Sequence, residues 1–274
     1  MTPARARRSL PRAAVALALP AAVAALLLAS CAPPAPRGLE PLEVMARRGA
    51  ERRERRLAAF ELQAVVRVDG RATGRLPAVS LNARLASPDR VRLQCRWLLG
   101  LLADVAVRGD TLVAWMPAER LGIRVPDLAD TLGVRDPALF LGRALTASWQ
   151  APREAWRAAV ADSGGATLAW PQGDERWTLR VDRDGRPRDV TVARGERTVT
   201  ARYAAWRGAG ERAWPARIDL ADGAGWLKVR FDLEDMRAAK RARAAWFALA
   251  LPEDARRLEL DDVKRVLSSR GGLR

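Results

Sequence analysis

The stretch VRLQCRWLLGLLADVAV, residues 91–107, changes character along its length and decides the fold. In its first half, apolar residues alternate with arginine and glutamine, which is typical of a strand with one apolar and one charged face. From Trp97 to Ala103 every residue is apolar or glycine, although Gly100 predicts a turn there. Soluble proteins usually place Gly, Asn, Asp or Ser at turns, so the leucines on both sides of Gly100 need an explanation.

Alternating patterns of the same kind recur along most of the chain and predict about ten strands. They lie near residues 60–68, 77–86, 91–99, 105–107, 112–116, 177–182, 190–192, 199–206, 218–220, 227–234 and 247–251. Helices are predicted at 42–60, 137–147 and 152–161, and residues 117–135 are irregular or helical. The sequence therefore predicts a mainly β fold with helices, in which short helices cover a curved antiparallel sheet.

The start of the chain resembles a bacterial lipoprotein signal. Four arginines (Arg5, Arg7, Arg8 and Arg12) precede an apolar segment, Ala13 to Leu28, that is too short and too rich in alanine for a spanning helix. The segment ends in Leu-Ala-Ser-Cys, and the resemblance implies that Cys31 carries the lipid. An ordinary secretory signal with an incidental cysteine remains the alternative.

Four parts of the chain follow from this interpretation. Residues 1–30 form the signal peptide, residues 31–41 a Pro-rich tether after lipidated Cys31, residues 42–262 the folded domain and residues 263–274 a polar tail. By resemblance to enterobacterial sorting rules, Ala32 after Cys31 favours the outer membrane. Cys95 is the other cysteine, so the mature chain has no intramolecular disulfide, and we expect Cys95 to pack as a small buried hydrophobe.

Composition limits the possible chemistry. Loss of the signal lowers the formal net charge from +16 to +12, nearly all of it from arginine, which favours contact with anionic headgroups. Nucleic acid is not predicted as a partner, because no basic stripe is interleaved with aromatics. Histidine is absent, which excludes Ser-His-Asp and Cys-His catalysis, and DRDGRPRD lacks the final glutamate of a calcium loop. We expect no metal, no cofactor and no enzyme activity; a carboxylate hydrolase is the least favoured alternative.

Five pieces occur in an order that resembles LolB and the related LolA-like outer-membrane lipoproteins. They are LASC at 28–31, RVRLQCRWLLGLLADVAVRGDTL at 90–112, PALFLGRAL at 137–145, the strand–turn–strand region at 179–235 and WFALALPEDA at 246–255. The resemblance implies an unclosed half-barrel over residues 42–255, whose apolar cavity holds acyl chains.

The resemblance also implies two sets of site residues. A protruding apolar loop would contact the membrane through Leu98, Leu99, Gly100, Leu101 and Leu102; the alternative is a tip folded back under a helix. Inward-facing side chains would line the acyl-chain cavity; the alternative is a filled core, although ten tryptophans favour a pocket. These cavity candidates are Trp97, Val105, Val107, Trp115, Leu139, Phe140, Leu145, Trp177, Leu179, Tyr203, Val229 and Phe231.

The expected function is that of a monomeric lipoprotein, anchored in the outer membrane and facing the periplasm, that passes acyl chains to the bilayer. Its partners would be the membrane, an acylated lipoprotein or lipid cargo and a periplasmic carrier protein. The alternative is a structural or assembly lipoprotein that uses the same fold to bind a protein partner.

Overall fold

A computed structural model describes residues 40–56, 59–70, 74–75, 77–86, 89–98, 100–225, 227–239, 243–259 and 262. They belong to a compact unit that starts at Leu39. The predicted signal, Cys31, the tether up to residue 39 and the tail 263–274 lie outside the described residues. Within the described part of the chain, no helix combines the length and the hydropathy needed to span a bilayer.

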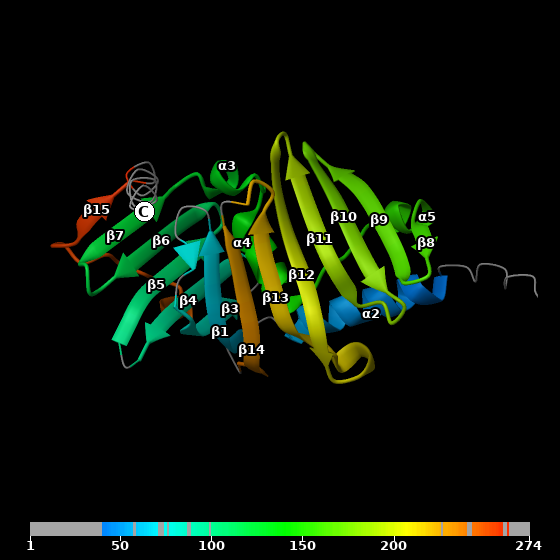
Figure 1. Ribbon diagram of the computed structural model, residues 1–274, viewed down its shortest axis with the longest axis horizontal. Helices are drawn as coiled ribbons and strands as arrows, with labels where there is room; N and C mark the ends of the chain where they lie inside the picture. The colour runs from blue at the N-terminus through cyan, green and yellow to red at the C-terminus, as the bar shows by residue number, and fades with distance from the viewer. Residues whose placement is uncertain are drawn as a thin grey trace, which may run out of the picture. The chain divides into compact units, whose positions relative to one another are not determined.

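One large sheet dominates the unit (Figure 1). Its strands follow the order β15-β7-β6-β5-β4-β3-β1-β14-β13-β12-β11-β10-β9-β8, and β2 pairs with β1. Every pairing is antiparallel except that of β15 with β7. The strands are β1 Phe60–Gly70, β2 Gly74–Arg75, β3 Val79–Ala86, β4 Arg90–Trp97, β5 Gly100–Arg108, β6 Thr111–Met116, β7 Leu121–Val125, β8 Val160–Asp162, β9 Gly165–Gln172, β10 Glu175–Asp182, β11 Pro187–Arg194, β12 Arg197–Arg207, β13 Trp214–Asp222, β14 Lys228–Ala238 and β15 Arg256–Leu258. The two end strands, β8 and β15, do not pair with each other, so the sheet is unclosed. The predicted fold class is therefore confirmed.

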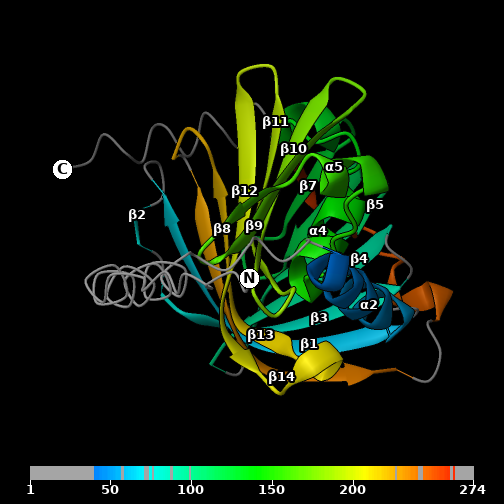
Figure 2. The ribbon, with the colours of Figure 1, turned by 90° about the vertical axis from the view of Figure 1, so that its right-hand side faces the viewer.

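Helices occupy the inner side of the sheet's curve. They are α2 Glu40–Arg56, α3 Leu128–Leu132, α4 Pro137–Thr146 and α5 Arg153–Arg157. Two short 3-10 turns lie in connections, η1 Gly210–Arg212 between β12 and β13 and η2 Ala244–Trp246 between β14 and β15. Figure 2 shows α2, α4 and α5 within the curve. Proline at the first position of α4 suits a helix start, because its missing N–H has no partner there in any case.

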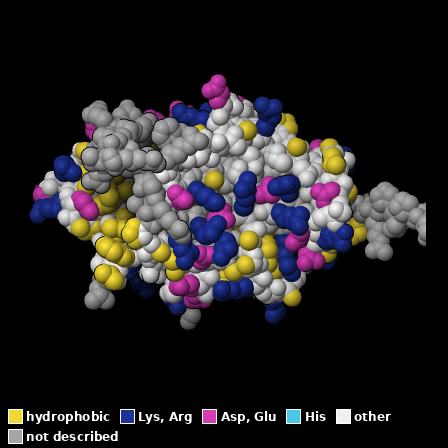
Figure 3. All heavy atoms as spheres, in the orientation of Figure 1, with side chains coloured by type: hydrophobic (Ala, Val, Ile, Leu, Met, Phe, Trp, Pro, Cys, Tyr) yellow, Lys and Arg dark blue, Asp and Glu magenta, His cyan; other side chains and the backbone are white. Residues whose placement is uncertain are grey.

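Alternation of side chains places the core and the charges on opposite faces of the sheet. In β1, Leu62, Ala64 and Val66 are buried on the inner face. The outer face carries arginine–carboxylate pairs across neighbouring strands, such as Arg217 with Asp232 at 2.8 Å and Arg230 with Asp219 at 2.7 Å. Figure 3 shows dark blue and magenta side chains interleaved over this part of the surface.

Several predicted elements differ from the structure. Residues 117–135 contain β7 as well as α3, and β9 was not predicted, because Gly165, Pro171 and small residues hide its alternation. The predicted helix at 152–161 is only Arg153–Arg157, since β8 follows it, and the helix predicted to Phe60 ends at Arg56. The predicted strand at 247–251 is irregular chain that crosses the outer face, and pairing resumes only at β15.

Candidate functional site

The β4–β5 hairpin ends in an exposed apolar tip. Leu98 is 85% exposed, Trp97 53% and Leu102 38%, whereas Leu101 is half-buried. Leu99 lies outside the described residues. In Figure 3, yellow side chains gather at the lower left, where Figure 1 places this hairpin. The tip is therefore presented to the surroundings and is not folded back under a helix at Trp97 and Leu98.

The backbone at the tip explains this exposure. Leu98 adopts a left-handed conformation with φ of 52°, a region that costs an ordinary L-residue about 1–2 kcal/mol. Trp97 pairs with Gly100, which offers the indole no side chain to pack against. A shift in register, with Cys95 opposite Ala103 but Arg96 opposite Leu101, leaves Leu102 as an extra residue. The bend expected at Gly100 thus lies two residues earlier: Leu98 makes the turn, and Gly100 begins β5.

Most of the residues predicted to line a cavity instead pack against one another. Aromatic rings fill the space inside the curve, with centroid distances of 5.4 Å from Phe140 to Trp149 and 5.8 Å from Trp149 to Trp177. Trp170 stacks on Trp177 at 5.9 Å. The buried members of the predicted set are Val107, Phe140, Leu145, Trp177, Leu179, Tyr203 and Phe231.

The remaining predicted residues are only partly buried or exposed. Val105 and Val229 pack against the edge of the core, and Trp115 and Leu139 are half-buried. Trp97 was predicted to face the cavity, but it belongs to the exposed tip, because the strand pairing ends beside it. Cys95, predicted to be buried, is half-buried against the core.

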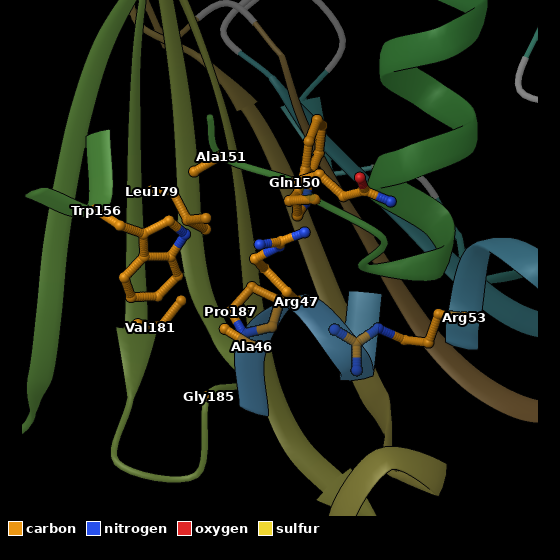
Figure 4. Close-up of a pocket in the computed structure, with 11 residues that line it drawn as sticks. Ala46, Arg47, Arg53, Gln150, Ala151, Trp156, Leu179, Val181, Gly185 and Pro187 are labelled. Atoms are coloured by element: carbon orange, nitrogen blue, oxygen red, sulfur yellow. The ribbon is translucent and has the colours of Figure 1, made fainter. Parts of the chain in front are cut away.

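A small pocket lies between α2, α5 and β10 (Figure 4). Its volume is about 10 Å³, room for about one water molecule. It is lined by Ala46, Arg47, Arg53, Trp149, Gln150, Ala151, Trp156, Leu179, Val181, Gly185 and Pro187. An acyl chain does not fit this pocket as it stands. The open cavity predicted for the interior, and the acyl-chain role of the residues that would line it, stay predictions.

Arg53 is a site residue that sequence reasoning missed. Arg53 lies in an arginine-rich helix, yet it is only 8% exposed and its Nε donates to the Ala147 carbonyl at 2.9 Å. Burial lowers its pKa to about 10. The signal was the spacing of Ala46, Ala50 and Arg53, which places the arginine on the same helix face as two small buried residues.

Tyr203 lies beside this arginine in the core. Its hydroxyl accepts a hydrogen bond from the Trp149 indole N–H, and burial raises the pKa of the phenol well above its ordinary value. The phenol is therefore neutral and does not compensate the charge of Arg53.

The described residues include no group of three His, Cys, Asp or Glu side chains placed to hold a metal ion. Several charged groups of the outer face are paired, as in Arg92 with Asp104 at 2.7 Å. The exposed apolar tip and the arginine side chains therefore suit the binding of a ligand or surface that is apolar and negatively charged.

The fold and the site define an unclosed half-barrel with helices inside its curve and an apolar hairpin tip. No protein-family model matches the chain, and no curated protein sequence matches it. Solved structures do match. A LolA superfamily protein from Nitrosomonas europaea is 14% identical, with 75% of this chain and 96% of that chain covered and a TM-score of 0.48.

Two further structures are similar over comparable lengths. A putative outer membrane lipoprotein-sorting protein domain from Vibrio parahaemolyticus is 10% identical, covering 81% of this chain and 97% of its own, with a TM-score of 0.47. The lipoprotein LppX of Mycobacterium tuberculosis is 11% identical, covering 74% and 99%, with a TM-score of 0.32.

Proposed function

We propose that the chain is an envelope lipoprotein, anchored through Cys31 in the outer membrane and facing the periplasm. It touches a bilayer with the β4–β5 tip and passes acyl chains of lipid or lipoprotein cargo to it without covalent catalysis. The observation that carries this proposal is the exposure of Trp97, Leu98 and Leu102 together at the end of one hairpin.

The free energy of burying the apolar tip supports its role as a membrane contact. An exposed apolar cluster on a charged protein marks a contact site, and full burial of one leucine contributes about 1.5–3 kcal/mol. Three large apolar side chains at one tip supply enough free energy for reversible binding, and the net positive charge adds attraction to anionic headgroups. The lipobox at residues 28–31 supports the same location.

The packed interior sets a condition on cargo binding. Phe140 and Leu145 of α4 lie within the curve and are buried, so an acyl chain enters when the helices inside the curve, α2 and α4, move away from the sheet. Transfer then depends on a small difference in burial free energy, because the interior and the bilayer both shield the chain from water.

The tip is tested with residues 32–274, which include the whole compact unit and lack both the signal and the lipid anchor. Leu98→Asn should weaken binding to vesicles of phosphatidylglycerol and phosphatidylethanolamine by about ten- to thirtyfold, since about 2 kcal/mol of apolar burial is lost. Asparagine tolerates the left-handed conformation better than leucine, so the free energy of unfolding should stay the same or rise. Vesicle flotation and urea unfolding measure the two effects.

Val160→Asn is the matched control, because Val160 is 68% exposed and lies on β8, at the other end of the strand order. Its vesicle binding should equal that of the parent chain. Equal binding by Leu98→Asn and the parent chain would contradict the role of the tip.

A second candidate function is the binding of a protein partner in envelope assembly. The packed interior favours it, because a pocket of about 10 Å³ offers an acyl chain no room without movement. Native mass spectrometry of the chain purified from its own envelope separates the two: co-purifying acylated species support the carrier, and a stoichiometric protein partner without acyl species supports assembly.

A further inference from the structure

The polar side chains that line the α2–α5–β10 pocket are rich in hydrogen-bond donors and include no carboxylate. Arg47 and Arg53 come from α2, and Trp156 comes from α5. In Figure 4 the indole nitrogen of Trp156 lies on the side of the ring that faces Leu179 and the α2 residues. A pocket with this lining favours a ligand that carries hydrogen-bond acceptors or negative charge.

Trp156 supplies an unused donor. The residue is 4% exposed, and its Nε1 is buried without a hydrogen-bond partner among the described residues. Buried indole N–H groups normally have an acceptor, so an unpartnered one that lines a pocket indicates the place of a ligand oxygen.

Arg53 supplies an uncompensated charge. Among the described residues its guanidinium contacts the Ala147 carbonyl and the face of the Trp206 ring, at 5.6 Å from the centroid, but no carboxylate. Arg186 approaches the same ring at 6.0 Å and adds positive charge nearby. Buried charges are normally paired, and here an anion on a ligand would provide the partner.

The remaining walls are apolar. Trp149, Leu179, Val181 and Pro187 line the pocket beside the donors, and the first three of these side chains belong to the buried core. The volume of about 10 Å³ admits one oxygen-sized group, and an attached alkyl chain would follow along these walls as α2 and β10 separate.

We infer that this pocket binds the anionic end of a single-chain amphiphile, in which the Trp156 N–H donates to a ligand oxygen and the buried Arg53 guanidinium supplies positive charge to the same pocket. A fatty-acid carboxylate and the phosphate of a lysophospholipid share this chemistry. The inference rests on the proposed lipid-binding function and names the ligand group that it recognises.

Isothermal titration of residues 32–274 with dodecanoate, dodecanol, lysophosphatidic acid and inorganic phosphate tests the inference, each below its micelle concentration. We expect dodecanoate to bind at least tenfold more tightly than dodecanol. Arg53→Met should abolish this preference by weakening dodecanoate at least tenfold, whereas dodecanol is unchanged. Trp156→Phe, which removes only the N–H donor from the pocket, should weaken dodecanoate several-fold.

Arg55→Met is the matched control, because Arg55 lies on the same helix with its side chain exposed; it should bind dodecanoate like the parent chain. Urea unfolding shows whether Arg53→Met remains folded. If Arg53→Met does not fold, Arg53→Gln is the second variant, because it keeps a donor for the Ala147 carbonyl. It should show the same loss of preference for dodecanoate over dodecanol.

Each other outcome has a definite meaning. Equal affinity for dodecanoate and dodecanol would overturn the anion site and leave lipid binding intact. If inorganic phosphate binds as tightly as dodecanoate, the inference that the ligand is an amphiphile is overturned, and the pocket is a site for free anions. If lysophosphatidic acid binds more tightly than dodecanoate, the inference is supported and the recognised anion is a lipid phosphate. If no amphiphile binds, both the site and the proposed function are overturned.

Discussion

At the scale of the residue, single side chains with unusual surroundings determine the local properties of this protein. Asp104 is buried beneath the C-terminal chain and accepts hydrogen bonds from Arg92 at 2.7 Å and from Gln94 at 3.0 Å. Burial raises the pKa of Asp104, but these hydrogen bonds and the charge of Arg92 outweigh it, and the pKa lies below its ordinary value. Asp104 therefore stabilises the fold in its charged form.

This arrangement predicts an acid-sensitive contribution to stability. A lowered carboxyl pKa gives stabilisation that is present above the unfolded value of 3.8 and is lost as the pH falls below it, through the folded pKa. Asp104→Ala should lower the free energy of unfolding at pH 7 by about 3 kcal/mol, because Arg92 is left without its partner. Urea unfolding between pH 7 and pH 2.5 measures both effects.

The exposed pair of Asp89 and Arg90, at 3.9 Å, provides the control. Asp89→Ala should change stability by less than about 1 kcal/mol. An Asp104→Ala variant as stable as this control would show that the buried pair contributes nothing.

At the scale of the element, the C-terminal segment 243–259 fastens itself over the outer face of the sheet. Arg92 donates to the Trp246 carbonyl at 2.9 Å, and the Arg84 guanidinium lies over the Trp246 ring at 4.9 Å. Leu251 occupies the space above Gly122 of β7, where a Cβ would meet its Cδ1 at 2.7 Å. Contacts to three strands thus hold a segment that has little regular structure of its own.

The close approach at Gly122 gives a prediction for this segment. Gly122→Val should push Leu251 away and destabilise the protein by about 1–3 kcal/mol through overpacking. Hydrogen exchange should accelerate in β15, which pairs with β7, and stay unchanged in β10 to β12. The double variant Gly122→Val with Leu251→Ala should recover part of the loss; exchange that accelerates equally in every strand would contradict this local effect.

At the scale of the whole molecule, the curved sheet encloses an interior that is filled by side chains from strands and helices far apart in sequence. The rings of Phe140, Trp149 and Trp177 meet there, and β1 joins β14 to bring residues 60–69 beside residues 228–238. Because the interior is packed, a lipid ligand must replace these contacts, and the free energy of opening reduces its apparent affinity.

Creating space in advance should therefore affect stability and binding in opposite directions. Phe140→Ala should lower the free energy of unfolding by about 3–5 kcal/mol and should raise the affinity for dodecanol, because less side-chain volume has to move. Urea unfolding and isothermal titration measure the two quantities. Val160→Ala, a change at an exposed position on β8 away from the tip, should leave both nearly unchanged. A Phe140→Ala variant that loses dodecanol affinity would contradict entry of the alkyl chain into this interior.

Local sequence determined the features that depend on neighbouring residues alone. Period-two alternation identified most strands, the proline before a helical pattern placed α4, and consecutive apolar residues around Gly100 predicted the exposed tip. These inferences succeeded because side-chain direction in a strand or helix depends on spacing along the chain.

Only the tertiary structure decided whether the apolar faces enclose a hollow or a core, because this depends on how side chains from distant segments fill a shared volume. The inward strand faces have the same pattern in both cases, and only the folded chain brings the buried residues of α4 against them. The burial of Arg53 and the unpartnered Trp156 N–H likewise arise from where α2 and α5 meet β10, a relation that no local spacing contains.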